Sequence, residues 1–253
     1  MSRWRDAEVR EKSILTGMYL SKFDQRGLKE LGFKSFREAR NIIGYALGSS
    51  PESIKNYRDE FDPLFPNPRK GWHKRPTRKN CLKVFEEYKD LDLASFANLV
   101  RSFVGYDVNV SSGLEPELDD AGESAFARRL ATGLAAERYF ISVSSDLSEF
   151  QGYLRENTTM YGCGYDFRFR RERTDNEFLA VEVKGLMESA GGLTMTRREH
   201  EAAEALRDRY YLFVVRNFQR SPTHQMFQDP LSGTLLFRKS ERMILQVSWL
   251  TSV

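Results

Sequence analysis

The sequence contains little cysteine, with only Cys81 and Cys163 among its 253 residues. Two cysteines are too few for a disulfide scaffold or a structural zinc site. Such a chain is typical of a reducing compartment, so we expect a cytoplasmic protein.

Long apolar runs are also absent. No stretch approaches the length needed to cross a bilayer, and the first residues, MSRWRDAEVREK, are charged and lack the apolar core of a signal peptide. We therefore expect no membrane partner. With 40% hydrophobic and 30% charged residues, the composition is that of an ordinary globular chain with room for one large or two modest domains.

The net charge is only +3, but the charges are unevenly distributed. Residues 66–83 contain no acid and carry the cations Arg69, Lys70, Lys74, Arg75, Arg78, Lys79 and Lys83. Clustered cations suit a polyanion, because each neutralised phosphate releases condensed counterions. A solvated basic linker would have the same composition, so charge alone leaves both interpretations open.

A segment rich in Gly, Ser, Pro and acids divides the chain. It spans residues 109–124, and we place a linker at residues 111–122 within it. The expected organisation is a helical domain at residues 1–110, which includes a basic arm at 66–83, and a second domain at 123–253. The second domain alternates helix and strand patterns, and its last part, residues 233–253, contains two further strand-like runs.

The stretch SFREARNIIGYALGSSPESIKNYRDEF predicts two helices around a tight turn. Gly48 can end the first helix in a left-handed conformation, and Ser50 with Pro51 can begin the second. The segment ALGSSPESIKNYR resembles the helix-turn-helix of DNA-binding regulators, whose second helix enters the major groove. That resemblance implies DNA contacts by Glu52, Ser53, Lys55, Asn56 and Arg58. An ordinary helical hairpin would show the same pattern, so that alternative stays open.

The segment FPNPRKGWHKRPTRKN follows at once, and its prolines, glycine and cations predict an extended arm. Such an arm can lie along a phosphate backbone or in a minor groove. Its candidate DNA contacts are Arg69, Lys70, Trp72, Lys74 and Arg75.

Two strands are predicted in the second domain, after a helix at residues 123–140. In YDFRFR, alternation puts Tyr165, Phe167 and Phe169 on one face and Asp166, Arg168 and Arg170 on the other. In FLAVEVKG, Leu179, Val181 and Val183 share one face, and Ala180, Glu182 and Lys184 share the other. Glu182 and Lys184 are then about 7 Å apart on one strand face. A simple surface ion pair would give the same E-x-K pattern.

A further helix and strand follow these two strands. Thr196 and Glu199 have the spacing of a capping box, which predicts a helix start and by itself explains both residues. The run YYLFVVRNF, residues 210–218, is almost wholly apolar and is typical of a strand inside a sheet.

This order of elements, with Asp166, Glu182 and Lys184 spaced as D-x15-E-V-K, resembles the core of the PD-(D/E)XK nucleases. Tyr165 stands where the name of that core expects proline. The segments TGLAAERYF, GYDFRF, VEVKG, TMTRREHEAAEAL and YYLFVVRNF more narrowly resemble the C-terminal domain of the plant NO VEIN protein, over residues 123–218. The implied fold class is α/β (α+β): an N-terminal helical, helix-turn-helix-like domain followed by a restriction-endonuclease-like mixed-sheet core.

The resemblance also implies a chemistry. Asp166 and Glu182 would bind Mg²⁺ with the backbone carbonyl of Val183, and Lys184 would orient the attacking water and face the scissile phosphate. Glu137, at the helix position of the family, would join a second metal or hold the water network. The expected protein is a type II restriction endonuclease that cuts double-stranded DNA as a homodimer, because a palindromic site needs two active sites related by a two-fold axis.

Three other functions fit the same sequence. One is a nuclease that senses modified DNA or acts in a larger defence system. Another is a DNA-binding regulator whose core has lost activity, although the intact D…E-V-K set argues against such decay. The third is an enzyme or interaction module that does not act on nucleic acid.

Overall fold

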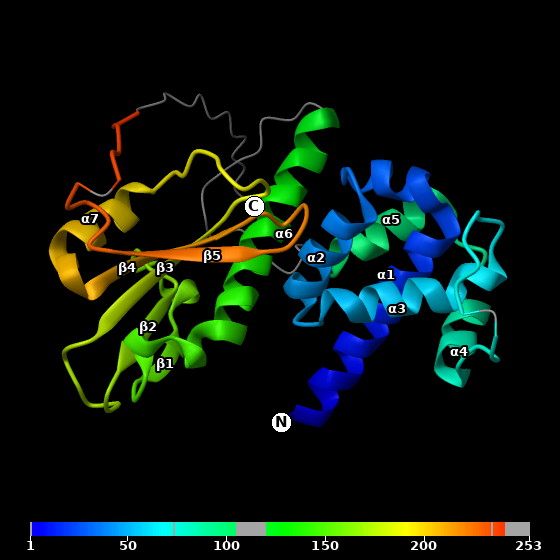
Figure 1. Cartoon of the computed structure of the whole chain (residues 1–253), viewed down its shortest axis with the longest axis horizontal. Coiled ribbons are helices and arrows are strands. Elements are labelled where there is room, and N and C mark those ends of the chain that lie inside the picture. The colour runs from blue at the N-terminus through cyan, green and yellow to red at the C-terminus, as the bar shows by residue number, and fades with distance from the viewer. Residues whose placement is uncertain (1, 73, 105–119, 234, 241–253) are drawn as a thin grey trace, which may run out of the picture.

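The computed structural model describes residues 2–72, 74–104, 120–233 and 235–240, with the backbone alone for residues 2–6 and 120–129. The first part is helical, and the second part is a five-stranded sheet with helices on both faces (Figure 1). Its helices and strands are α1 (Ser2–Glu30), α2 (Phe36–Leu47), α3 (Pro51–Phe61), α4 (Lys79–Tyr88), α5 (Leu93–Ser102), α6 (Asp120–Val143), β1 (Leu154–Asn157), β2 (Phe167–Arg170), β3 (Leu179–Gly185), α7 (Arg197–Leu206), β4 (Tyr210–Arg216) and β5 (Thr223–Gln228). This arrangement confirms the predicted α+β class.

The two helices predicted in the first part are present, with the expected caps. Gly48 ends α2 at φ 72°, in the left-handed region that favours glycine. The side chain of Ser50 accepts the Ser53 N–H and caps α3, with Pro51 in its first turn. The predicted extended arm ends sooner than expected, because α4 begins at Lys79 and takes in the last residues of the basic stretch.

The sheet has the order β1-β2-β3-β4-β5. The central pair β3 and β4 is parallel, and the other three pairs are antiparallel. A parallel pair needs a crossover connection, and α7 lies in the connection between β3 and β4. Glu182 and Lys184 are opposite Leu212 and Val214 of β4, so both lie in the interior of the sheet.

The helices α6 and α7 cover opposite faces of this sheet. Val181, Val183 and Phe213 belong to the large hydrophobic cluster that includes Phe140 of α6. Ala180 and Tyr210 instead form a small cluster with Ala203 of α7. Glu182 and Lys184 alternate with Val181 and Val183, so their side chains lie on the α7 face.

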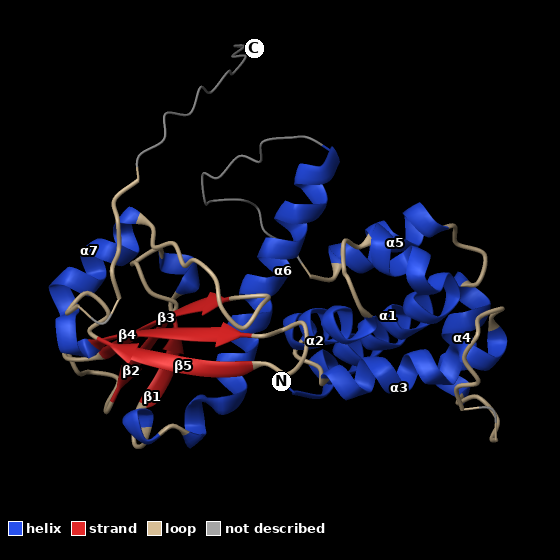
Figure 2. Cartoon of the chain, turned by 45° about the horizontal axis from the view of Figure 1, so that its top comes forward, coloured by secondary structure: helices blue, strands red, loops and turns tan. Residues whose placement is uncertain are grey.

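The two parts of the chain pack directly against each other, with α2 against α6 (Figure 2). The ring of Tyr45 in α2 contacts those of Tyr139 and Phe218 at centroid distances of 5.4 and 6.3 Å. The amide of Asn41 donates to the carbonyl oxygens of Phe218 and Arg220 at 2.7 and 2.9 Å. One hydrophobic cluster therefore runs from α1 through α6 to β4.

Several local predictions need correction. Tyr165 does not share a face with Phe167, because β2 begins only at Phe167 and Tyr165 packs with Phe178 against the α7 cluster. The helix α6 begins at Asp120, three residues before its predicted start, and the rest of the predicted linker, 111–119, lies outside the described residues. Of the last segment, residues 235–240 form no strand and 241–253 lie outside the described residues.

Two edge strands, β1 and β5, were not predicted from the sequence. In β5 the first three residues are exposed, and β1 is exposed at all but one position. An edge strand buries little side-chain surface, so the alternation that predicts an interior strand is weak there.

No helix in the part of the chain that the structure describes is long and apolar enough to span a membrane.

Candidate active site

The structure brings Asp166, Glu182 and Lys184 together at the end of β3. Asp166 lies at the bend before β2, and its Oδ2 accepts the backbone N–H of Val183 at 2.9 Å. On the α7 face, Lys184 Nζ lies 2.7 Å from Glu182 Oε1. Glu182 is only 5% exposed, so the pair is not the surface ion pair that the sequence allowed.

A fourth residue, Glu199 of α7, joins this group. Its Oε2 accepts from Lys184 Nζ at 2.6 Å and from the backbone N–H of Thr196 at 3.0 Å. The same carboxylate therefore completes the capping box of α7 and binds the lysine that Glu182 also binds. From the sequence, capping alone had explained Glu199, because spacing within α7 gives no indication of which strand residue the carboxylate reaches.

Burial and mutual repulsion raise the pKa values of the carboxyl groups. Burial raises the pKa of Glu182 well above its usual range, and the charge of Asp166 adds to this. Burial raises the pKa of Asp166 to about 6, against the opposing effects of the Val183 N–H and Lys184. For Lys184, burial lowers the pKa, but Glu182 and Glu199 outweigh it and the pKa is raised.

Glu137 of α6 belongs to the same electrostatic group. Burial, followed by repulsion from Asp166, raises the pKa of Glu137 to about 8. Asp166 thus repels both Glu137 and Glu182, and Glu199 repels Asp166 and Glu182, while Lys184 and, at Glu137, Arg138 act in the opposite direction. The carboxyl groups outnumber the ammonium group, which is the arrangement that a bound cation would relieve.

Carboxyl, histidine and cysteine side chains do not by themselves form a complete metal cage here. Within the described residues, no group of three or more such side chains is placed to hold a metal ion. Any ion at this site would therefore need backbone carbonyl or water ligands beside Asp166 and Glu182. Such mixed coordination is usual for Mg²⁺, which keeps several waters.

The loop at residues 158–164 lies just before Asp166 in the chain and is bonded to its backbone. Gly164 has φ 89°, and a Cβ there would lie 2.4 Å from the carbonyl oxygen of Arg198 in α7, so only glycine fits. The hydroxyl of buried Tyr210 donates to the Gly164 carbonyl at 3.0 Å. The loop is therefore pinned to both α7 and β4 immediately before Asp166.

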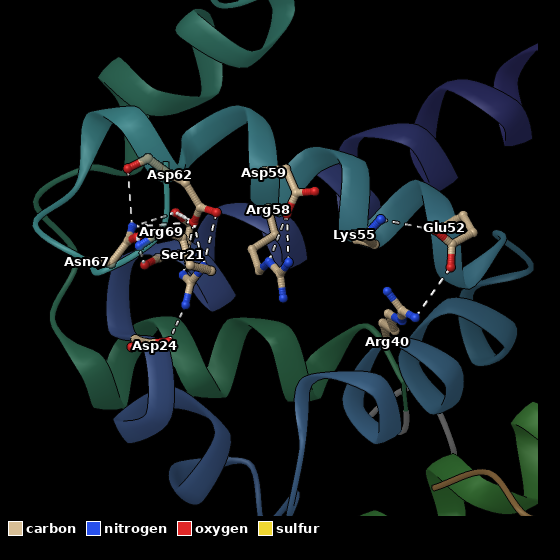
Figure 3. A network of polar contacts seen from close by, with 10 residues as sticks. All are labelled: Ser21, Asp24, Arg40, Glu52, Lys55, Arg58, Asp59, Asp62, Asn67 and Arg69. Carbon is tan, nitrogen blue, oxygen red and sulfur yellow. Dashed lines mark hydrogen bonds and ion pairs between the residues drawn. The ribbon is translucent and has the colours of Figure 1, made fainter. Parts of the chain in front are cut away.

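The predicted DNA contact Arg69 lies in a polar network of its own (Figure 3). Its guanidinium donates to both oxygens of Asp62 at 2.9–3.1 Å and also binds Asp24. Asp24 has φ 49° and interrupts the helical conformation of α1. Asp62 is 2% exposed and also accepts from Ser21 at 2.8 Å. The Arg69 side chain therefore links α1 to the segment after α3.

The other arginine of the predicted contacts in the arm is held in a similar way. Arg75 forms a two-pronged contact with buried Glu60, at 3.0 and 2.6 Å, and lies over the ring of Trp72. Arg78 binds the same carboxylate at 3.0 Å. Lys70, Trp72 and Lys74 are exposed.

On α3 the predicted contacts differ in availability. Arg58 binds Asp59 at 2.7 Å, whereas Lys55 lies 3.7 Å from Glu52 (Figure 3). The Arg58 guanidinium also lies over the ring of Phe36. Glu52 also lies 3.4 Å from Arg40. Ser53 donates its N–H to the capping Ser50, and Asn56 is exposed. These contacts are all within the protein, and the role of the α3 and arm residues in DNA binding stays a prediction.

Comparison with known families gives one match. Residues 136–228, from Ala136 in α6 to the end of β5, match the family model described as Protein NO VEIN, C-terminal. All five acid and lysine residues of the candidate site lie within that range, and the helical first part lies outside it. Comparisons with curated proteins and with solved structures found no match.

Proposed function

We propose that this chain is a Mg²⁺-dependent endonuclease with a PD-(D/E)XK site, and that it hydrolyses phosphodiester bonds of double-stranded DNA as a type II restriction enzyme. One observation carries the proposal. The carboxylate of Asp166 binds the backbone of β3 between Glu182 and Lys184, so the three side chains of the D…E-V-K pattern meet at one end of the sheet.

The donor set suits a hard divalent cation. Asp166 uses one carboxylate oxygen for the Val183 N–H, which leaves the other for an ion. In an antiparallel pair the N–H and C=O of one residue point to the same side, so the Val183 carbonyl also faces Asp166. Asp166, Glu182 and this carbonyl would hold Mg²⁺, which when bound lowers the pKa of a water ligand and balances charge developing on phosphate.

Lys184 is the residue that would contact the attacking water and the scissile phosphate. Its ammonium is held between Glu182 and Glu199 at 2.7 and 2.6 Å, which fixes its position and keeps it protonated. A fixed cation stabilises negative charge without the cost of reorganising water. Glu199 is in this proposal a positioning residue that acts through Lys184, and Glu137 would hold the water network beside Asp166.

The helical first part would grip the duplex, with a homodimer bringing two sites to a palindrome. The exposed side chains that support this are Asn56 on α3 and Lys70, Trp72 and Lys74 in the arm. Lysine contacts to phosphate position a protein on DNA without reading its sequence.

The direct test is digestion of phage or genomic DNA with Mg²⁺ by the parent protein and by Asp166→Ala and Lys184→Ala. We expect discrete fragments from the parent, and a loss on the order of 10²–10³-fold or more in cutting rate for both variants, with DNA binding retained. Glu199→Gln should reduce cutting less, by roughly tenfold, whereas Glu204→Gln, which changes an exposed carboxylate of the same helix, should not change it. Equal cutting by all variants would remove the assignment.

The same digest separates the alternatives if methylated and unmethylated plasmids are cut side by side. Cutting of methylated DNA alone would indicate a modification-dependent nuclease. Binding without cutting by the folded parent, at any divalent metal ion tested, would instead indicate a regulator.

A further inference from the structure

Two large apolar side chains are exposed beside the candidate active site. Met160 is 94% exposed and Tyr161 is 69% exposed, and they are neighbours in the 3-10 turn Thr159–Tyr161. Single exposed apolar residues are normal on protein surfaces. An adjacent pair on a pinned loop next to a charged site is a candidate contact surface.

The turn that carries this pair is fixed to Asp166. The N–H of buried Thr158 donates to the Asp166 carbonyl at 2.8 Å, and the Thr158 hydroxyl donates to the Tyr165 carbonyl at 3.0 Å. The N–H of Tyr161 then donates to the Thr158 carbonyl at 2.8 Å. A 3-10 turn rises about 2 Å per residue, so the Tyr161 backbone lies roughly 6 Å along the turn from that of Thr158. Successive nucleotides of one DNA strand are about 3.4 Å apart along the helix axis. The apolar pair is therefore only a few nucleotides away from Asp166 on this scale.

Exposed cations flank the same loop. Arg198 at the start of α7 donates to the Gly162 carbonyl at 3.3 Å. Arg197 beside it has a side chain that is 91% exposed and forms a surface ion pair with Glu201 at 2.6 Å, which a phosphate could replace. Gly162 and Gly164 both have positive φ, at 59° and 89°, which shapes the loop between the apolar pair and Asp166. In a nucleic acid, stacked bases lie between two rows of phosphates. Exposed apolar side chains can contact the bases while nearby arginines contact the phosphates, so this loop has the chemistry of a nucleic-acid contact.

We infer that the 158–164 loop is a DNA wedge: Met160 and Tyr161 enter the duplex beside the phosphate to be cut and partly unstack one base step. This inference rests on the proposed nuclease function and adds to it the way in which the site engages its substrate. Unstacking costs a few kcal/mol per step, which contacts with the bent duplex offset. Arg197 and Arg198 contact the backbone on either side of that step.

The exposed apolar residues could instead contact a second copy of the chain. Leu154 of the edge strand β1 is 52% exposed, so β1 could pair with another sheet. Duplex DNA is favoured because the turn that carries the apolar pair is bonded through Thr158 to the backbone of Asp166, and because Arg198 binds the same loop at Gly162. A strand-to-strand contact needs neither feature.

The test compares a Met160→Ala, Tyr161→Ala double variant with Leu236→Ala, which removes a leucine that is 92% exposed and lies outside the proposed DNA contacts. Both should unfold thermally like the parent. With Ca²⁺ in place of Mg²⁺, we expect the double variant to bind fragments of genomic DNA roughly tenfold more weakly or worse, as in losses of base stacking. The Leu236 variant should stay within about twofold of the parent. Permanganate, which attacks unstacked thymines, should modify DNA bound by the parent and not DNA bound by the double variant.

The possible results separate this inference from the proposed function. If the parent cuts DNA and the double variant equals it in affinity and permanganate pattern, the wedge is wrong and the nuclease stands. If the parent binds but does not cut, and the double variant binds weakly, the wedge stands and the nuclease is wrong. A parent that does not bind DNA overturns both. A double variant whose molar mass in solution falls while its DNA affinity holds would assign the loop to self-association and overturn the wedge.

Discussion

The arm around Arg69 and the site around Lys184 are both dense clusters of charge, but they are balanced differently. In the arm, Arg69 meets Asp24 and Asp62, and two further arginines share Glu60. In the site, Lys184 faces several carboxyl groups whose pKa values are raised by burial, and Arg138 acts on one of them, Glu137. The positive charges of these arginines are therefore neutralised by acids within the protein, whereas the site has more carboxyl groups than cations.

This difference shows that a run of like charges in a sequence does not by itself locate a binding surface. Arg69 belongs to the most basic stretch of the chain, yet its guanidinium is directed into the protein (Figure 3). Compensated clusters hold elements together, and uncompensated ones are where an external ion or substrate gains most. The three predictions below test that contrast.

The largest expected effect is the loss of stability when the compensated network is broken. Asp62→Ala leaves Arg69 and Ser21 without their shared acceptor, so we expect the free energy of unfolding to fall by about 3 kcal/mol. Urea denaturation measures this, with exposed Asp208→Ala as a control expected near zero. In the metal-free protein at neutral pH, Glu182→Gln should be at least as stable as the parent, because burial disfavours the charged form of Glu182 and because Lys184 keeps Glu199 as an ion-pair partner. An equal loss in both variants would erase the contrast.

The second prediction concerns pH. The pKa of Glu137 is about 8 in the folded protein against 4.5 for a free glutamate, so between these values the folded state holds a proton that the unfolded state has lost. Stability of the metal-free protein must therefore fall as pH rises through this window. We expect a lower melting temperature at pH 8.5 than at pH 6, and a smaller difference in Glu137→Gln. Glu201→Gln should keep the full parental difference, and a rise in stability with pH would contradict the assignment.

The smallest expected effect concerns the exposed lysines of the arm. If Lys70 and Lys74 each neutralise one phosphate, the double alanine variant should lower the slope of log binding constant against log salt concentration by about 2. Affinity measured over a salt series gives this slope. Lys29→Ala, an exposed lysine at the end of α1, should leave it unchanged. An unaltered slope in the double variant would place the DNA-binding surface elsewhere.

The sequence predicted those parts of the fold whose cause is local. Ser50, Gly48 and the Thr196–Glu199 capping box mark helix ends through contacts within a few residues. The alternation around Glu182 and the apolar run of β4 follow from burial in the middle of a sheet. Asp166, Glu182 and Lys184 could also be predicted as a group, because the resemblance supplied the long-range contact that spacing alone does not.

Contacts between distant segments could not be predicted in this way. Nothing near Arg69 in the sequence indicates Asp24, which lies in α1, 45 positions earlier in the chain. The bond between Glu199 and Lys184 depends on how α7 is placed against β3. The packing of Tyr165 on the α7 side of the sheet depends on the bend that precedes β2. Each is decided by tertiary packing, which overrides the local pattern.

The Asn41 amide has a mechanical consequence. It fastens α2 to the turn directly after β4, the strand that is parallel to the one bearing Glu182 and Lys184. If the proposed nuclease function holds, a force that bound DNA exerts on the helical part would reach the candidate site through this contact and would not be lost in a flexible linker. Recognition and cleavage would then depend on the alignment of the two parts as one body on the DNA.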